Sequence, residues 1–253
     1  MKRDNLFNKA GNILYRAKEI SKNKGLYYVI KSGIKMGVNS LILPFWYCYY
    51  RTSESSRTFI FQGKTYRYFN SFRNRTWRNE RAVEIPIIYE IVMEYPEERI
   101  LEVGNVLSHY FSVKHDVVDK YEKNYNVINQ DVVDFRPAKK YDLIVGSSTL
   151  EHVGFDEDPC EPLKILQAIE NLISLLNPKG KIVVTLPLGY NPTMDRLIDE
   201  DKLKLTKRYC LKRISRDNKW METDWEDVKT ATYDYHYLFD TANGLVIGII
   251  EKE

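Results

Sequence analysis

The sequence predicts an α/β fold in which a mostly parallel sheet carries helices on both faces and ends in a C-terminal antiparallel hairpin. From Arg99 onward, short apolar runs alternate with helical patterns, which is typical of parallel strands joined by crossover helices. Near the end of the chain, "YDYHYLFD" and "LVIGIIEK" flank the turn sequence "TANG", which indicates two antiparallel strands. We therefore expect a main domain over residues 57–253, preceded by a helical extension over residues 1–56.

The extension is strongly basic. Residues 1–35 hold nine Lys and Arg against two Asp and Glu, a net charge of +7, whereas the whole chain carries +3. Residues 6–17 place apolar side chains at helical spacing with basic ones opposite, and such a helix can lie on a membrane surface. The alternative is that this helix packs on the main domain. Because the apolar stretch "LILPFWYCYY" follows at 41–50, we favour peripheral membrane contact through residues 1–50.

Several classes of protein are disfavoured by the composition. The longest uncharged stretch, 36–50, has fifteen residues and falls short of the roughly 20 that span a bilayer. Cys48, Cys160 and Cys210 lie far apart, so neither a disulfide framework nor a zinc site is indicated. The acidic run "FDEDP" at 155–159 lacks histidines at ligand spacing and is interpreted as a solvated loop. We expect a cytoplasmic protein without a metal, at the inner face of the membrane.

The first part of the main domain mixes aromatic and basic residues. The stretch "FIFQGKTYRYF" alternates around Gln62 and Gly63, which predicts a β-hairpin. Arginines and aromatic residues interleave over 57–81, a mixture that can stack on bases or sugars while holding phosphates. The alternative is a cap that packs on the core and leaves its arginines in solvent. The helix that follows is expected to end near Tyr95 and Pro96.

Five strands are predicted next, with helices between most of them. The clearest helix covers 162–176, and "NPKG" stops it. The predicted strands are 100–103, 116–119, 126–129, 143–147 and 181–186.

Polar residues stand at the ends of these strands, where open α/β sheets bind their ligands. Glu102 can accept a hydrogen bond from a ligand amine, and Gly104 lets the backbone approach closely. Asp119 ends the second strand and can take both hydroxyls of a ribose. Asp131 follows the third strand and can accept the amine of an adenine, beside Val132.

Together these signals resemble the class I S-adenosylmethionine-dependent methyltransferases. The resemblance covers about 99–190 and rests on "EVGN", the two later aspartates, "LEHV", and "LNPKGKIVVTLPLG", in the same order and spacing. It implies a Rossmann-like fold and S-adenosylmethionine as cofactor. Only the first glycine of that family's turn is present, and Val106 and Ser108 follow it. The residues that the resemblance implies for cofactor binding are Glu102, Gly104, Asn105, Asp119, Asp131, Val132 and Ser147.

The same resemblance suggests where the acceptor would react. His152 is the candidate base, because neutral imidazole can remove a hydroxyl proton, and Glu151 could orient it. The alternative is a structural pair that only shapes the cofactor pocket. Tyr190 and Asn191 are expected to line the acceptor pocket. Arg81, or Arg78, could meet the methionine carboxylate, with a surface role as the alternative.

The predicted function is transfer of the S-adenosylmethionine methyl group to a hydroxyl, or less readily an amine, of a small-molecule, glycan or glycolipid acceptor. Two rivals stay open. One is an RNA methyltransferase that uses residues 57–81 as its nucleic-acid surface. The other is a scaffold that keeps the fold without the cofactor. This alternative is suggested by Val106 and Ser108, which follow the only glycine of the turn. The sequence does not determine the oligomeric state.

Overall fold

A computed structural model describes residues 44, 45, 47–49, 52, 56–236 and 239–253. The chain divides into two compact units, Met1–Ser53 and Glu54–Glu253, and the second unit is the α/β domain. The predicted basic helix at 6–17 lies outside the described residues, as does most of the expected membrane-contact segment. Among the residues that are described, no helix is both long and apolar enough to cross a bilayer.

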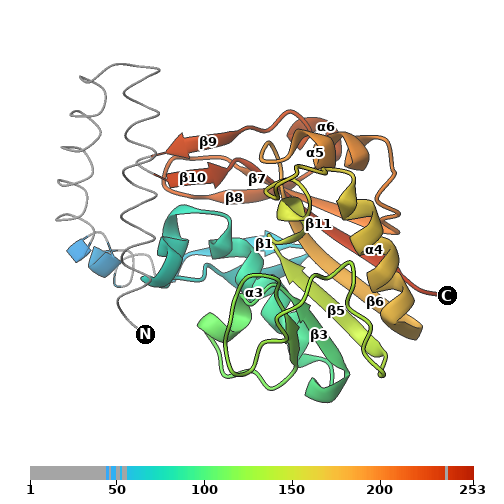
Figure 1. Ribbon diagram of the computed structural model, residues 1–253. Helices are drawn as coiled ribbons and strands as arrows, with labels where there is room; N and C mark the ends of the chain where they lie inside the picture. The colour runs from blue at the N-terminus through green and yellow to red at the C-terminus, as the bar shows by residue number, and fades with distance from the viewer. Residues whose placement is uncertain (1–43, 46, 50–51, 53–55, 237–238) are drawn as a thin grey trace, which may run out of the picture. The chain divides into compact units, whose positions relative to one another are not determined.

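A seven-stranded sheet forms the centre of the domain, in the order β4-β3-β5-β6-β11-β7-β8 (Figure 1). The first four strands in this order are parallel to one another. β11 runs antiparallel to both of its neighbours, and β8 is antiparallel to β7. The strands are β3 (Ile100–Val103), β4 (Asp116–Val118), β5 (Tyr141–Ser147), β6 (Leu176–Pro187), β7 (Lys207–Arg213), β8 (Trp220–Thr223) and β11 (Gly244–Glu251). The mostly parallel sheet and its antiparallel C-terminal addition are confirmed.

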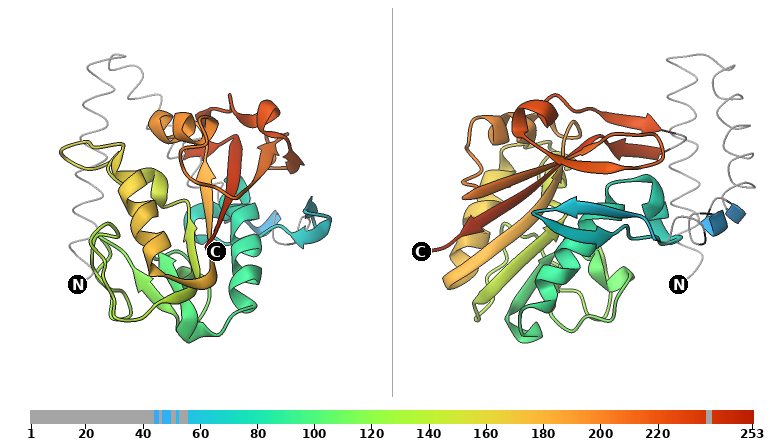
Figure 2. Two further views of the ribbon diagram at one scale, coloured as in Figure 1. Left: turned by 90° about the vertical axis from the view of Figure 1, so that its right-hand side faces the viewer. Right: turned by 180° about the vertical axis from the view of Figure 1, so that it is seen from behind.

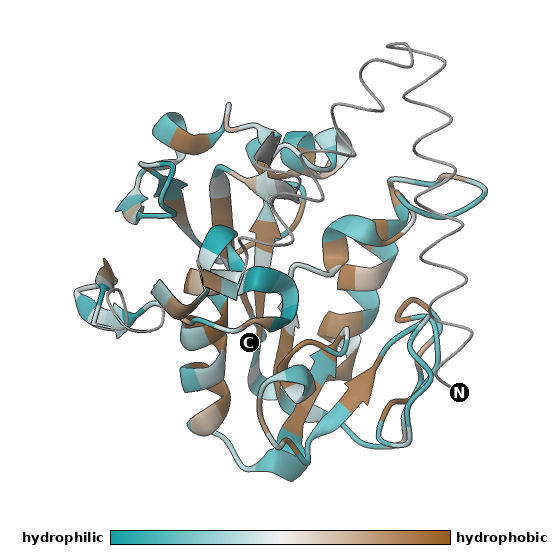
Figure 3. Cartoon of the chain, turned by 90° about the vertical axis from the view of Figure 1, so that its left-hand side faces the viewer, coloured by the Kyte–Doolittle hydropathy of each residue, from teal (hydrophilic) through white to brown (hydrophobic). Residues whose placement is uncertain are grey.

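Helices cover both faces of this sheet, as predicted (Figure 2). Successive residues of β5 alternate between two cores, since Leu143 and Val145 belong to one apolar cluster and Ile144 to the other. The first core includes α3 (Arg81–Met93), and the second includes α4 (Lys164–Leu175) and α5 (Pro192–Asp199). Figure 3 shows the hydrophobic residues concentrated along the strands and the inner sides of these helices.

The predicted hairpin is present as β1 (Thr58–Phe61) and β2 (Lys64–Arg67). Gln62 and Gly63 both have positive φ, at 50° and 73°, as a tight two-residue hairpin turn requires. Phe59 is buried against the core, and Trp77 is 2% exposed. The aromatic residues of 57–81 are therefore largely used in packing, which supports the interpretation of this stretch as a cap.

The structure corrects three local predictions. The segment 126–129 is not a full strand, because it makes only the single bridge between Val118 and Ile128. The helices expected between most of the predicted strands are largely absent from the described chain: α4 lies between β5 and β6, no α-helix lies between β4 and β5, and after β3 the chain forms only the short 3-10 helix η3 (Leu107–His109). "NPKG" lies inside β6 and so begins a strand as well as ending a helix.

The C-terminal strands also pair differently from the prediction. β9 (Tyr233–His236) pairs with β10 (Phe239–Ala242) in a separate two-stranded sheet. The main sheet instead receives β11, which is paired with β6 and with β7, a strand the sequence analysis did not identify. The remaining short elements are η1 (Arg73–Arg78), η2 (Glu97–Arg99), η4 (Leu150–His152) and α6 (Trp225–Val228).

Candidate active site

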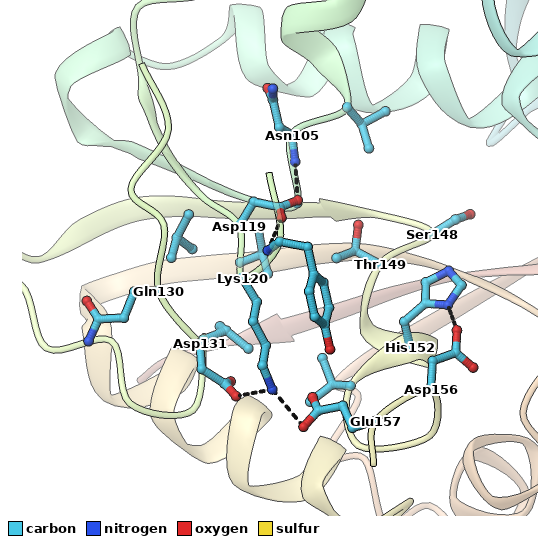
Figure 4. A pocket seen from close by; sticks show the side chains of 17 residues that line it. Asn105, Asp119, Lys120, Gln130, Asp131, Ser148, Thr149, His152, Asp156 and Glu157 are labelled. Carbon is cyan, nitrogen blue, oxygen red and sulfur yellow. Dashed lines mark hydrogen bonds and ion pairs between the residues drawn. The ribbon is translucent and has the colours of Figure 1, made fainter. Parts of the chain in front are cut away.

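A cavity of about 370 Å³ lies at the carboxyl ends of β3, β4 and β5 (Figure 4). This is the edge of an open α/β sheet at which ligands are expected, and the volume is in the range of small-molecule sites. Its lining comes from the segments that follow each strand, namely residues 103–106, 118–121, 130–132, 148–149, 152–153 and 156–157. Separate parts of the sequence thus meet in one pocket, as the positions of the predicted site residues implied.

Gly104 occupies a position at which any side chain would be strained. Its φ is +80°, a left-handed conformation, and a Cβ added there would lie 2.4 Å from the Oγ1 of Thr149. Thr149 belongs to the turn after β5, so the glycine allows two strand ends to approach each other across the pocket. Gly104 and Asn105 both line the cavity, where the sequence placed them.

Glu102 lies beneath this turn and is not part of the cavity lining. Its side chain is 1% exposed. The Oε1 atom accepts hydrogen bonds from the backbone N–H groups of Val106 and Leu107, at 2.9 and 2.7 Å. The Oε2 atom lies 2.9 Å from Nε2 of His115. The structure therefore shows Glu102 holding the turn, a contact that the sequence analysis missed.

Asp119 follows β4 and lines the cavity as expected. Its Oδ1 atom accepts the backbone N–H groups of Tyr121 and Glu122, at 2.8 and 2.7 Å. Its Oδ2 atom accepts the N–H of Asn105 at 3.2 Å, which ties the end of β4 to the turn after β3. The carboxylate is thus fixed at the pocket wall by three backbone donors.

Asp131 and Val132 also line the cavity, and Asp131 belongs to a cluster of two carboxylates and two lysines. Its Oδ2 atom lies 2.7 Å from Nζ of Lys164 and 2.9 Å from Nζ of Lys120. Both lysines also reach Glu157, at 2.7 Å each. Burial raises the pKa of Asp131, but hydrogen bonds from Lys164 and Lys120 outweigh this and lower it to about 2. This carboxylate is therefore ionised at neutral pH.

At the end of β5, the wall is formed by Ser148 and Thr149, whereas Ser147 is buried and absent from the lining. The backbone carbonyl of Ser147 accepts a hydrogen bond from Arg81. Ser148 has a φ of +42°, and its hydroxyl donates to Oε2 of Glu84 at 2.6 Å. Ser148 and Thr149, and not Ser147, thus line the cavity. The sequence pattern does not distinguish between these neighbours.

Arg81 does not line the cavity either. Its guanidinium lies 3.0 Å from Oε1 of Glu84, with side-chain exposures of 18% and 0%. Arg78 is likewise absent from the lining, and its carbonyl accepts a hydrogen bond from Arg213. The two arginines therefore contribute to the packing around the site, and neither is placed on its wall.

His152 lines the β5 end of the cavity with a half-exposed imidazole. Its Nδ1 atom lies 2.6 Å from Oδ2 of Asp156, which makes Asp156 a closer partner than Glu151, whose Oε1 is 3.6 Å from Nε2. The Tyr190 hydroxyl donates to the same Asp156 oxygen at 2.5 Å, and its ring packs edge-on against the imidazole. The sequence analysis assigned Asp156 to a solvated loop, although a spacing of four residues from His152 was a usable signal.

The other two predicted residues of this region are buried. Burial raises the pKa of Glu151 well above its ordinary value, so the neutral form of this carboxyl group is favoured relative to an exposed glutamate. Its Oε2 atom has no hydrogen-bond partner within the structure described. Asn191 is 0% exposed and caps α5, because its Oδ1 accepts the N–H groups of Thr193 and Met194. The structure thus places Asn191 in a helix cap rather than on an acceptor wall.

Comparisons with known proteins give similarity only at the level of fold. No protein-family profile matches the chain, and no curated protein sequence matches it. Among solved structures, the N-methyltransferase NodS from Bradyrhizobium japonicum, in complex with S-adenosyl-L-homocysteine, is 13% identical with a TM-score of 0.42, over 68% of this chain and 87% of that one. An rRNA methylase from Streptococcus thermophilus is 10% identical with a TM-score of 0.41, over 67% and 96%.

A TehB-like methyltransferase from Corynebacterium glutamicum is 18% identical with a TM-score of 0.37, over 64% of this chain and 85% of that one.

Because these identities and TM-scores are low, the fold assignment rests on the chain's own topology. Its parallel strands β4, β3, β5 and β6 are followed by β11, which is inserted antiparallel between β6 and β7. In the described part of the chain, no group of three or more His, Cys, Asp or Glu could hold a metal ion. The topology of the domain is that of a Rossmann-like α/β fold with an antiparallel C-terminal addition.

Proposed function

We propose that the protein is an S-adenosylmethionine-dependent methyltransferase that methylates a hydroxyl group of a small-molecule, glycan or glycolipid acceptor. The observation that carries this proposal is the cavity itself. It brings Gly104, Asp119 and Asp131 together at the carboxyl ends of three neighbouring strands, with His152 at its far end. A binding site for a nucleoside and a base for an acceptor are therefore adjacent.

The residues of the cavity fit this cofactor. Gly104 lets the turn after β3 lie directly against Thr149, which also lines the cavity, so a side chain at Gly104 would displace part of the cavity wall. Asp119 offers a fixed carboxylate to the ribose hydroxyls, and Asp131 offers one to the adenine amine, beside the apolar wall of Val132. Glu102 supports the turn from beneath, so its part in binding is indirect.

The charge of the lining fits as well. Among the Asp, Glu, Lys and Arg side chains of the lining there are four carboxylates and Lys120, which gives a net charge of −3. Lys164 is outside the lining but pairs with Asp131, and including it brings the sum to −2. A cleft of one sign favours a ligand of the opposite sign. S-adenosylmethionine carries a sulfonium and an ammonium group against one carboxylate, so its net charge is positive.

His152 is suited to act as the base. The bond from Nδ1–H to Asp156 fixes the tautomer that leaves the Nε2 lone pair free to accept a proton from a hydroxyl. When bound, S-adenosylmethionine would supply an electrophilic methyl group for the acceptor oxygen, whose proton His152 would take. Asp156 then stabilises the imidazolium, and Tyr190 holds Asp156 in place. Glu151, whose pKa burial raises, lies farther from the imidazole, with its Oε1 atom 3.6 Å from Nε2 of His152.

The first experiment is isothermal titration of the protein with S-adenosylhomocysteine. Asp119→Asn is the informative variant, because its amide oxygen can still accept the N–H groups of Tyr121 and Glu122, while the charge and the acceptor for the N–H of Asn105 are lost. Glu170→Gln on α4 is the matched control, since this exposed carboxylate pairs only with Lys204 in the structure described. We expect micromolar binding, weakened about tenfold or more in Asp119→Asn, or ~1.4 kcal/mol, and unchanged in the control.

The acceptor is then identified by transfer of a labelled methyl group to glycolipid, glycan and RNA pools. Turnover on RNA, with binding that falls linearly in log salt, would replace the hydroxyl acceptor by a nucleic acid. A folded protein that binds no S-adenosylhomocysteine would point to the scaffold alternative. The proposal is supported if the label appears on a glycan or glycolipid and is released by a treatment that cleaves methyl ethers.

A further inference from the structure

The turn after β3 has no free backbone donors at its start. The N–H of Gly104 donates to the carbonyl of Val118 at 2.8 Å, and that of Asn105 donates to Asp119 at 3.2 Å. The next two N–H groups, of Val106 and Leu107, both donate to Oε1 of Glu102. Four successive donors are thus committed to acceptors within the protein.

These donors matter because a strand that ends in a turn and a helical segment is a common binding site for phosphate. Its free N–H groups point at the anion, as in dinucleotide-binding turns. Here a carboxylate of the chain itself takes the place of that anion. Glu102 is held there by a third donor, since His115, itself 5% exposed, reaches its Oε2 at 2.9 Å.

The charge of the cavity acts in the same direction. Asp119, Asp131, Asp156 and Glu157 line it, and Lys120 is the only Lys or Arg among the described lining residues and is paired with two of these carboxylates. A phosphate in this cavity would meet net negative charge and an N–H cradle that is already filled.

We propose that Glu102 is a specificity-determining residue: its carboxylate fills the N–H cradle after β3, so that the cavity takes an adenine nucleoside without phosphate and excludes nucleotides and dinucleotides. This inference rests on the proposed function, because it takes an adenosyl compound as the ligand. It also explains why Val106 and Ser108 can stand where a pyrophosphate-binding turn needs glycines. The bulk of these side chains matters little when no phosphate approaches the backbone.

The test compares two ligands that differ at the 5′ position, 5′-methylthioadenosine and adenosine 5′-monophosphate, by isothermal titration beside S-adenosylhomocysteine. The wild-type protein is expected to bind the thioether at least about tenfold more tightly than the phosphate. In Glu102→Gln, the amide oxygen still accepts the two N–H groups but the charge is gone, so this preference should fall by about threefold or more. Glu122→Gln is the control, because Glu122 accepts a bond from the Asn105 side chain at the same turn but leaves the cradle untouched.

A second measurement does not depend on any ligand. Hydrogen exchange of the wild-type protein should show slow exchange at the amides of Val106 and Leu107. Fast exchange at both would overturn the proposal, even if Glu102→Gln does not fold. Equal affinity for the thioether and the phosphate would overturn the proposal about Glu102. If S-adenosylhomocysteine still binds, the proposed function would stand. Binding of none of the three ligands by folded protein would overturn both.

Discussion

The Nδ1 atom of His152 lies 2.6 Å from Oδ2 of Asp156, and this pair is closer than the contact of His152 with its sequence neighbour Glu151. The pair lies at one end of a cavity whose other end carries Gly104 and Asp119. In the proposed reaction, Asp156 sets the tautomer of the base and stabilises its charged form.

Loss of the Asp156 charge should therefore lower turnover without lowering cofactor affinity. We expect Asp156→Asn to reduce kcat by about one to two orders of magnitude, in line with the contribution of a positioned base. Binding of S-adenosylhomocysteine should stay within about threefold, and the pH profile of kcat should shift. Glu161→Gln, in the same loop, is the control. An Asp156→Asn enzyme with full activity would remove His152 and Asp156 from the reaction.

The turn glycine can be tested against a second glycine with similar backbone geometry. Gly104 and Gly63 have φ values of +80° and +73°, but a Cβ meets Thr149 only at Gly104, while nothing lies within 4 Å at Gly63. Alanine at either position should cost ~1–2 kcal/mol of unfolding free energy from the left-handed backbone. Only Gly104→Ala should in addition weaken S-adenosylhomocysteine binding, as measured by titration. Equal binding by the two variants would show that this close approach is irrelevant to the site.

Recognition of the adenine amine can be tested with S-inosylhomocysteine, which has a carbonyl in place of that amine. Wild-type protein should prefer S-adenosylhomocysteine, because the ionised Asp131 carboxylate can only accept hydrogen bonds. Asp131→Asn should narrow this preference by about tenfold, since an amide can donate as well as accept. A loss of affinity that is equal for both ligands would mean that Asp131 acts only through its lysine partners.

Asp195 predicts a pH dependence of stability. Burial raises its pKa to about 6, while its Oδ2 accepts the N–H of Gly189 at 2.8 Å. Because the folded pKa exceeds the unfolded value near 3.9, the folded state binds more protons between about pH 4 and pH 6. The contribution of Asp195 to stability is thus fully present below about pH 4 and is lost as the pH rises through 6.

Melting temperatures of wild-type and Asp195→Asn proteins, recorded from pH 4 to pH 8, check this dependence. The melting temperature of Asp195→Asn should rise relative to that of wild type as the pH rises. The melting temperature of the control variant Glu170→Gln should show no such trend. A constant difference across the range would contradict the raised pKa.

The basic N-terminal segment predicts binding to anionic membranes. Each Lys or Arg near such a surface contributes about 1 kcal/mol, so replacing Lys18, Lys22 and Lys24 by glutamine should weaken binding by roughly two orders of magnitude. Sedimentation with vesicles of phosphatidylserine and phosphatidylcholine measures this, with pure phosphatidylcholine vesicles as the control. Binding that ignores the lipid charge would contradict the membrane prediction.

Much of the fold could be predicted because its signals are local. The parallel strands, the Gln62–Gly63 turn and the amphipathic helix α4 each follow from neighbouring residues, and all three are present, whereas most of the helices expected between the strands are absent from the described chain. Pairing between distant segments has no local signal. The place of β7 beside β11 was missed because the residues of β11 that pair with it are more than 30 positions away in the sequence.

The site shows the same division. The sequence by itself determined which strand ends carry polar residues, so Gly104, Asn105, Asp119, Asp131, Val132 and His152 all line the cavity. Only the tertiary structure decided which atoms face the cavity and which face the protein. Glu102 turns inward to the N–H groups of its own turn, Asn191 caps a helix, and Arg81 pairs with Glu84. Buried polar groups must find hydrogen-bond partners. Some of these partners are distant in the sequence, namely His115 for Glu102, the Ser147 carbonyl for Arg81 and the Glu151 carbonyl for Asn191, and the order of residues does not reveal them.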